Sequence, residues 1–173
     1  MQPSVTLVTP DAAMIDAAMH DQARLAARLE CELADGWVSF ERVLPPTRDA
    51  LAADPGFARW GPRLFLSGDP RTLVGWGGFK GPPREGAVEL GYEVAPGWRG
   101  RGLATAAVAA MLVDAFADPR VEAVLAHTLA EPGPSVRVLE KSGFARTGEV
   151  SDVEGGTLWR FRLRRSDGTD EQQ

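Results

Sequence analysis

The stretch that decides the fold reads GYEVAPGWRGRGLA and covers residues 91–104. A run that is typical of a β-strand, residues 87–94, leads into it, and a helical pattern of apolar residues follows from Leu103. Gly100 and Gly102 lie between the two and let the chain turn tightly. A pyrophosphate is bound by several backbone N–H groups at the positive end of a helix. The stretch therefore predicts a strand–turn–helix unit that binds phosphate groups.

Charged and small side chains flank these glycines. Arg99 and Arg101 can add charge-assisted contacts to phosphates, Ala104 is small enough not to obstruct them, and Thr105 can donate its hydroxyl. A turn that uses glycine only to change direction is the alternative. A Rossmann site is disfavoured because Gly-x-Gly-x-x-Gly is absent, and a Walker loop because no Gly-Lys-Ser/Thr follows. The expected anion contacts are Arg99, Gly100, Arg101, Gly102, Leu103, Ala104 and Thr105.

On the N-terminal side of this stretch, the pattern predicts a short strand near residues 5–8, one helix over about residues 11–33 and another near residues 47–53. Short turns separate three runs, residues 63–66, 72–79 and 87–94, which favours antiparallel pairing.

On the C-terminal side, we expect a helix from Leu103 that Asp118-Pro119 ends, and then a buried strand over residues 121–127. A helix over residues 135–141, closed by Gly143, and a last strand over residues 159–163 complete the order. The fold class expected is α/β, with a mixed sheet flanked by helices.

Length and composition fit an ordinary globular protein. The 173 residues are 44% hydrophobic, carry a net charge of −5 and include one cysteine, Cys31, so no intramolecular disulfide can form. The acidic balance argues against nucleic acid as a partner, and no run is apolar enough to span a membrane. We expect one domain over residues 1–165, a disordered tail over residues 166–173 and a cytoplasmic location.

Two separate segments resemble the GNAT acetyltransferase superfamily. Residues 91–104 are similar to its motif A, whose pattern Arg/Gln-x-x-Gly-x-Gly/Ala is matched by Arg99, Gly102 and Ala104. Residues 135–144 resemble the following helix with its Glu-Lys-x-Gly-Phe ending. Residues 77–81 and 89–92 are similar to the branch that includes ribosomal-protein N-terminal acetyltransferases.

This resemblance implies a GNAT-like fold in which a central parallel pair of strands splays apart, with helices on both faces. It implies acetyl-CoA as co-substrate, with its pyrophosphate on residues 99–105, its pantetheine beside the backbone near Val94, and no metal. The protein would be an acyltransferase that moves an acetyl group directly to a primary amine of a small molecule or of a protein N-terminus. Relatives commonly carry an asparagine just before the second-motif helix, whereas this chain has Glu131-Pro132-Gly133-Pro134 and contains no asparagine.

Amine attack requires that a base or a water relay removes a proton from the substrate. Glu89 is the first candidate for the base, because the family often places a glutamate on this strand and burial would raise its pKa. Glu93 lies on the same face of the strand, and His127 ends the next strand. A carboxylate that is merely solvated, or that anchors a substrate cation, remains the alternative.

A donor for the departing thiolate is harder to identify. Relatives often use a tyrosine where this chain has Leu139, and the one tyrosine is Tyr92. The role then falls on Ser135 or on water, although Ser135 also has the features of a helix N-cap. A domain that binds acyl-CoA as a sensor without turnover is the alternative function. Family habit makes a homodimer plausible. The run of Arg160, Arg162, Arg164 and Arg165 could form a basic patch, but on an alternating strand it is interpreted as a solvated face.

Overall fold

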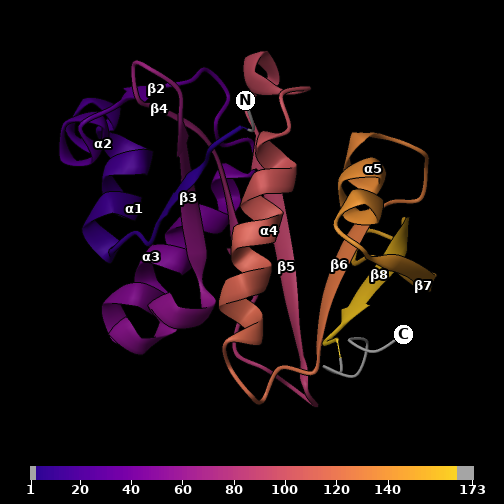
Figure 1. Ribbon diagram of the computed structural model, residues 1–173. Coiled ribbons are helices and arrows are strands. Elements are labelled where there is room, and N and C mark those ends of the chain that lie inside the picture. The colour runs from indigo at the N-terminus through magenta and orange to yellow at the C-terminus, as the bar shows by residue number, and fades with distance from the viewer. Residues whose placement is uncertain (1–2, 167–173) are drawn as a thin grey trace.

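The computed structural model describes residues 3–166 of the chain (Figure 1). The predicted tail, residues 166–173, lies outside the described residues except for Ser166. The helices and strands follow in the order β1 (Thr6–Val8), α1 (Ala12–His20), α2 (Gln22–Leu29), β2 (Glu32–Leu33), α3 (Leu44–Ala53), β3 (Pro62–Ser67), β4 (Thr72–Phe79), β5 (Ala87–Val94), α4 (Leu103–Phe116), β6 (Ala123–Leu129), α5 (Pro134–Lys141), β7 (Ala145–Ser151) and β8 (Thr157–Arg164). Among the described residues, no helix has the length and apolarity that crossing a membrane requires.

One sheet runs through the molecule in the order β1-β3-β4-β5-β6-β8-β7, with β2 beside β4. Its pairs are antiparallel, apart from the central β5–β6 pair and the short β2–β4 pair. β5 pairs with β6 only over Ala87–Glu89, after which the two strands diverge, as Figure 1 shows. The expected mixed α/β fold with a splayed parallel pair is confirmed.

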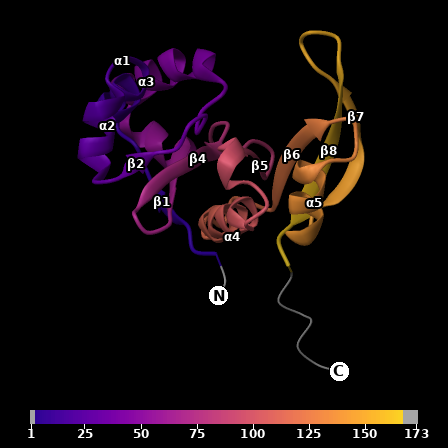
Figure 2. The ribbon, with the colours of Figure 1, turned by 90° about the horizontal axis from the view of Figure 1, so that it is seen from above.

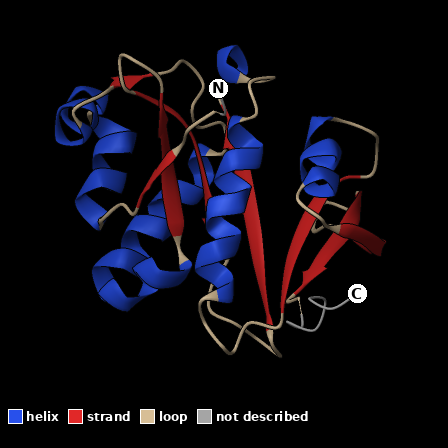
Figure 3. Ribbon diagram, in the orientation of Figure 1, coloured by secondary structure: helices blue, strands red, loops and turns tan. Residues whose placement is uncertain are grey.

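Helices cover both faces of the N-terminal half of the sheet and one face of the C-terminal half (Figures 2 and 3). α4 and α5 pack on one face through a cluster that includes Phe65, Leu90, Met111, Leu139 and Phe161. α1, α2 and α3 pack on the other face of β3 and β4 through a second cluster that includes Ile15, Leu25, Leu51, Leu64 and Leu73. Successive side chains of a strand point to opposite faces of the sheet, so the same strands contribute apolar residues to both clusters.

Three sequence predictions differ from the structure. The helix expected over residues 11–33 is two helices, because Asp21 accepts a hydrogen bond from the Arg24 N–H and begins α2 where α1 ends. The strand β7 was not predicted, since its side chains are mostly exposed and its residues show no apolar alternation. Ser135 is not the N-cap of α5: Gly133 holds that position, and Pro134 is the first helical residue.

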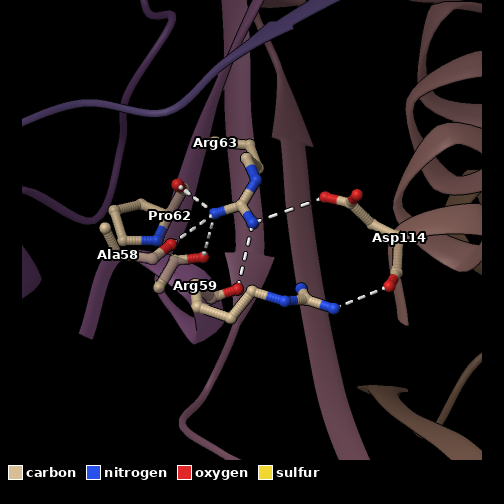
Figure 4. A network of polar contacts seen from close by, with 6 residues as sticks. Ala58, Arg59, Pro62, Arg63 and Asp114 are labelled. Carbon is tan, nitrogen blue, oxygen red and sulfur yellow. Dashed lines mark hydrogen bonds and ion pairs between the residues drawn. The ribbon is translucent and has the colours of Figure 1, made fainter. Parts of the chain in front are cut away.

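A buried arginine joins the sheet to α4 (Figure 4). Arg63, 5% exposed, donates from Nη1 to the carbonyls of Ala58 (2.9 Å), Gly61 (3.3 Å) and Pro62 (3.0 Å). Its Nη2 donates to the Arg59 carbonyl (3.0 Å) and lies 3.4 Å from Asp114 Oδ2 on α4. Burial lowers the pKa of Arg63, and the Asp114 charge opposes that shift. These contacts fix the helix that starts at the glycine-rich turn.

Candidate functional site

The glycine-rich turn connects β5 to α4 through a short 3-10 helix at Pro96–Trp98. Gly100 and Gly102 have φ values of +74° and +75°, which side-chain-bearing residues rarely adopt. A Cβ at Gly102 would lie 2.9 Å from Pro3 Cγ, whereas a Cβ at Gly100 would meet nothing within 4 Å. Position 102 therefore requires glycine both for its backbone angle and for its packing against Pro3. At Gly100 there is open space through which a ligand can approach the backbone.

The first turn of α4 presents unpaired donors. Gly102 is the N-cap and supplies no side-chain hydrogen bond. Within residues 3–166, no acceptor bonds the backbone N–H groups of residues 102–105. These groups and the helix dipole favour a negative charge at this end of α4. The residues predicted as anion contacts therefore lie together, around one set of N–H donors.

Both turn arginines contact backbone carbonyls. Arg99 Nε donates to the Val94 carbonyl at 3.0 Å, and Arg101 Nη2 donates to the Gly97 carbonyl at 3.0 Å. The Arg101 guanidinium also lies 4.7 Å from the centre of the Trp98 ring. Each guanidinium has five N–H donors, so most remain for a further ligand.

The backbone of β5 has an unpaired edge where it leaves β6. Lys80 N–H donates to the Glu89 carbonyl and Ala95 N–H to the Val74 carbonyl, so the alternate residues of β5 bond β4. The residues between them, which include Tyr92 and Val94, direct their N–H and C=O groups to the other edge. Beyond Glu89 no strand in the described part of the chain pairs with that edge, and Arg99 Nε reaches the Val94 carbonyl there.

Three titratable side chains meet where the strands begin to diverge. Glu89 Oε1 accepts a hydrogen bond from Lys80 Nζ at 2.6 Å and lies 2.9 Å from His127 Nδ1. The side chains of Glu89 and His127 are 29% and 18% exposed. Burial acts to raise the pKa of Glu89, but the hydrogen bond and charge of Lys80, followed by those of His127, hold it below the usual value. The expectation that burial would raise this pKa is wrong, because it ignored Lys80.

Glu93 has different hydrogen-bond partners from Glu89. Its Oε1 accepts from the Ser39 N–H at 2.9 Å and from Trp76 Nε1 at 2.5 Å, and its Oε2 accepts from the Ser39 hydroxyl. Both carboxylate oxygens therefore hold the segment after β2 against the sheet. This use leaves Glu93 poorly suited to accept a proton from a substrate.

Tyr92 and Ser135 meet across the gap between β5 and α5. The Tyr92 hydroxyl donates to the Ser135 carbonyl at 3.1 Å, and burial raises the pKa of Tyr92, so the phenol stays protonated. Ser135 itself is exposed in the first turn of α5. The contact uses the Ser135 backbone and leaves its hydroxyl available.

Sequence reasoning missed Lys80 as part of this site. The only available signal was its place at the end of β4, one short connection before β5, which brings it opposite Glu89 in an antiparallel pair. It also missed that the arginines of β8 lie on the same face as His127, since the pairing of β8 with β6 is not local in the sequence.

Comparison with known proteins gives a consistent picture. Residues 7–145 match the family model described as acetyltransferase (GNAT) domain. A search of curated proteins finds no match. Among solved structures, the chain is similar to Mycobacterium smegmatis RimJ in complex with CoA-disulfide, with a TM-score of 0.67, 21% identity and coverage of 92% of this chain and 81% of that one. It is also similar to ribosomal-protein-S5-alanine acetyltransferase from Vibrio fischeri (TM-score 0.67, 14% identity, coverage 94% and 93%). A third similar structure is aminoglycoside acetyltransferase AAC(6')-Ib with coenzyme A and kanamycin (TM-score 0.66, 18% identity, coverage 94% and 95%).

Proposed function

The chain belongs to the GNAT acetyltransferase family, and on that basis we propose that it moves an acetyl group from acetyl-CoA directly to a primary amine, either of a small molecule or of a protein N-terminus. The observation that carries the proposal is the set of N–H groups at residues 102–105 that have no acceptor among the described residues, one short connection after the strand that diverges from its parallel neighbour. The coenzyme A bound in two of the similar structures supports the same co-substrate here.

The turn suits the pyrophosphate of acetyl-CoA. The open space at Gly100 lets an anion approach the backbone, and the helix dipole of α4 favours its charge. Arg99 and Arg101 add charge, since each uses only part of its donors on carbonyls. Leu103, Ala104 and Thr105 contribute through the first turn of α4.

The free edge of β5 suits the pantetheine arm. Its amides need backbone partners, and the N–H and C=O groups of Tyr92 and the N–H of Val94 face the divergence, while the Val94 carbonyl accepts from Arg99 Nε. This arrangement would direct the thioester toward the point where β5 and β6 separate. Glu89 and His127 lie at that point. The acyl carbon would then be close to groups that can move a proton.

We assign proton removal to the pair formed by His127 and Glu89. Because the Glu89 carboxylate is held ionised, His127 donates its Nδ1–H to it, which leaves Nε2 as the acceptor. The amine nitrogen attacks the thioester carbon, the C–N bond forms and the C–S bond breaks with its electron pair on sulfur. The proton lost by nitrogen goes to His127 Nε2, directly or through water, and Glu89 stabilises the resulting imidazolium.

The thiolate then needs a proton or a hydrogen bond. The Ser135 hydroxyl in the first turn of α5 is the candidate donor, and the Tyr92 hydroxyl holds that turn in place through the Ser135 carbonyl. Water is the alternative donor. Ser135 therefore acts on the leaving group in this scheme, and Tyr92 acts as its positioning residue.

Release of free thiol from acetyl-CoA in the presence of a panel of amines and short peptides tests this function. The proposal expects acceptor-dependent thiol release and a product heavier by one acetyl group. Tight acetyl-CoA binding without turnover on any amine would instead favour the alternative of an acyl-CoA sensor.

A further inference from the structure

No helix of residues 3–166 covers the face of the C-terminal half-sheet that carries Glu89 and His127. α4 and α5 lie on the opposite face of β6, β8 and β7, and α1–α3 cover only the N-terminal half (Figure 2). The register places Glu89 opposite Leu125 and Leu125 opposite Arg162, while His127 is opposite Arg160. Directly opposed residues share a face of a sheet. The arginines of β8 therefore continue the proton-transfer site across this open face.

A cavity of about 560 Å³ lies on this face and has a cationic lining. Arg160, Arg162 and Arg164 all line it, together with Leu125 and Thr147. Among the residues that the structure describes, none that lines this cavity carries a carboxylate. Arg160 and Arg164 are exposed, as expected for a solvated face, whereas Arg162 is only partly exposed and its Nε is buried without a hydrogen-bond partner among the described residues.

These three arginines differ in their partners from five others among the described residues. Those five, Arg28, Arg42, Arg48, Arg63 and Arg120, each pair with a carboxylate. Within residues 3–166, none of Arg160, Arg162 and Arg164 lies within 4.0 Å of one, and the side-chain hydrogen bond that orients Arg160 comes from Nε to the Thr147 hydroxyl at 3.1 Å. Like charges at alternate positions on one face of a strand repel one another, so an anion bound there would relieve that repulsion.

We propose that this cavity receives a carboxylate of the acceptor while the acceptor amine lies at His127, so that the preferred acceptor is a peptide N-terminus with an acidic side chain close behind it. This inference rests on the proposed acetyl transfer. Strands lie about 4.8 Å apart, so the cationic cavity is one to two strand spacings from the proton-transfer pair. An extended peptide advances about 3.5 Å per residue, which places an acidic second or third residue over the arginines. A free α-amino acid holds its amine and carboxylate too close together to reach both places.

Equilibrium binding to the protein–coenzyme A complex tests the inference without requiring turnover. Two hexapeptide amides, Ser-Glu-Glu-Ala-Ala-Trp and Ser-Gln-Gln-Ala-Ala-Trp, differ only in charge. The acidic peptide should bind at least tenfold more tightly, and Arg160→Gln and Arg162→Gln should each remove most of that difference. Arg24→Gln, an exposed arginine on α2, is the matched control and should leave it unchanged.

Acetylation of the same two peptides separates this inference from the function on which it rests. Equal binding of both peptides, or an equal loss for both in the arginine variants, overturns the acidic acceptor even if the amines are acetylated. A charge preference in binding, with no acetylation of any amine, overturns the transferase function and leaves the anion site standing. Binding of single-stranded RNA that is lost in the same variants, with no preference between the peptides, would replace the peptide by a nucleic acid.

Discussion

His127 Nδ1 lies 2.9 Å from Glu89 Oε1, and the two residues come from the two parallel strands whose pairing ends at Glu89 and Leu125. Lys80 Nζ, 2.6 Å from the same oxygen, keeps the carboxylate charged. A carboxylate held in this way is a poor base but a good partner for an imidazole, because it orients the ring and stabilises its protonated form. From this relationship we propose that His127, rather than Glu89, accepts the proton.

Replacing His127 should therefore slow the chemical step. We expect His127→Gln to lower kcat by about 100-fold, since a positioned general base contributes roughly 10²–10⁴. Acetyl-CoA affinity should not change. Steady-state kinetics over a range of pH checks this, with His20→Gln on α1 as the control that keeps wild-type rates. A His127→Gln enzyme with normal kcat would show that another group or bulk water takes the proton.

Glu89 should also affect stability in a pH-dependent way. Its pKa in the folded protein lies below the ordinary value of 4.5, so its ionised form stabilises the fold above that pH. That contribution is lost as pH falls through the folded pKa. The difference in unfolding free energy between wild type and Glu89→Gln should be largest near neutral pH and shrink below pH 4.5. Denaturant unfolding at several pH values measures it, and a difference that grows on acidification would have the wrong sign.

Substitutions of Tyr92 and Ser135 should have different effects: the first should lower stability, and the second should lower the rate of the reaction. Tyr92→Phe removes the hydrogen bond to the Ser135 carbonyl and should lower the unfolding free energy by about 1 kcal/mol. Ser135→Ala keeps that bond and should preserve stability while lowering kcat. Thermal unfolding and kinetics of both variants distinguish the roles. Unchanged kcat in Ser135→Ala would assign thiolate protonation to water.

Arg63 should contribute to the stability of the fold and take no direct part in acetyl transfer. Arg63→Met leaves several carbonyls and Asp114 without their donor, so we expect a loss of about 3 kcal/mol. Arg120→Met, which removes a pair on the surface beside α4, is the control and should cost much less stability than Arg63→Met. Urea denaturation of both variants measures the two losses. Equal losses would mean that the network in Figure 4 adds nothing beyond a surface ion pair.

Local sequence signals explain which parts of the fold could be predicted. The strands β4 and β5 and the helix α4 carry regular apolar patterns bounded by glycine or proline, and their predicted ranges agree closely with the structure. The break at Asp21 was missed because the alanine-rich composition continues through it. β7 was missed because strand pairing, rather than burial, defines it.

The candidate site also has a part that the sequence predicts and a part that depends on long-range strand pairing. The turn of residues 99–105 is contiguous in the sequence, so its donors could be found there. Glu89 and His127 come from β5 and β6, Lys80 directly follows β4, and only the register of the three strands brings these side chains together. The arginines of β8 could be read as a strand pattern, but the face that they share with His127 depends on long-range pairing.

Titration of acetyl-CoA into the protein by calorimetry tests the central claim most directly, with Gly100→Glu and Gly155→Glu beside the wild type. Both glycines have positive φ, at +74° and +81°, and open space for a side chain, so the two variants carry the same backbone strain. Only Gly100→Glu places a negative charge at the phosphate turn. We predict saturable binding by the wild type and Gly155→Glu and its loss in Gly100→Glu. A folded wild type that does not bind acetyl-CoA, or a Gly100→Glu variant that binds it normally, would contradict the account.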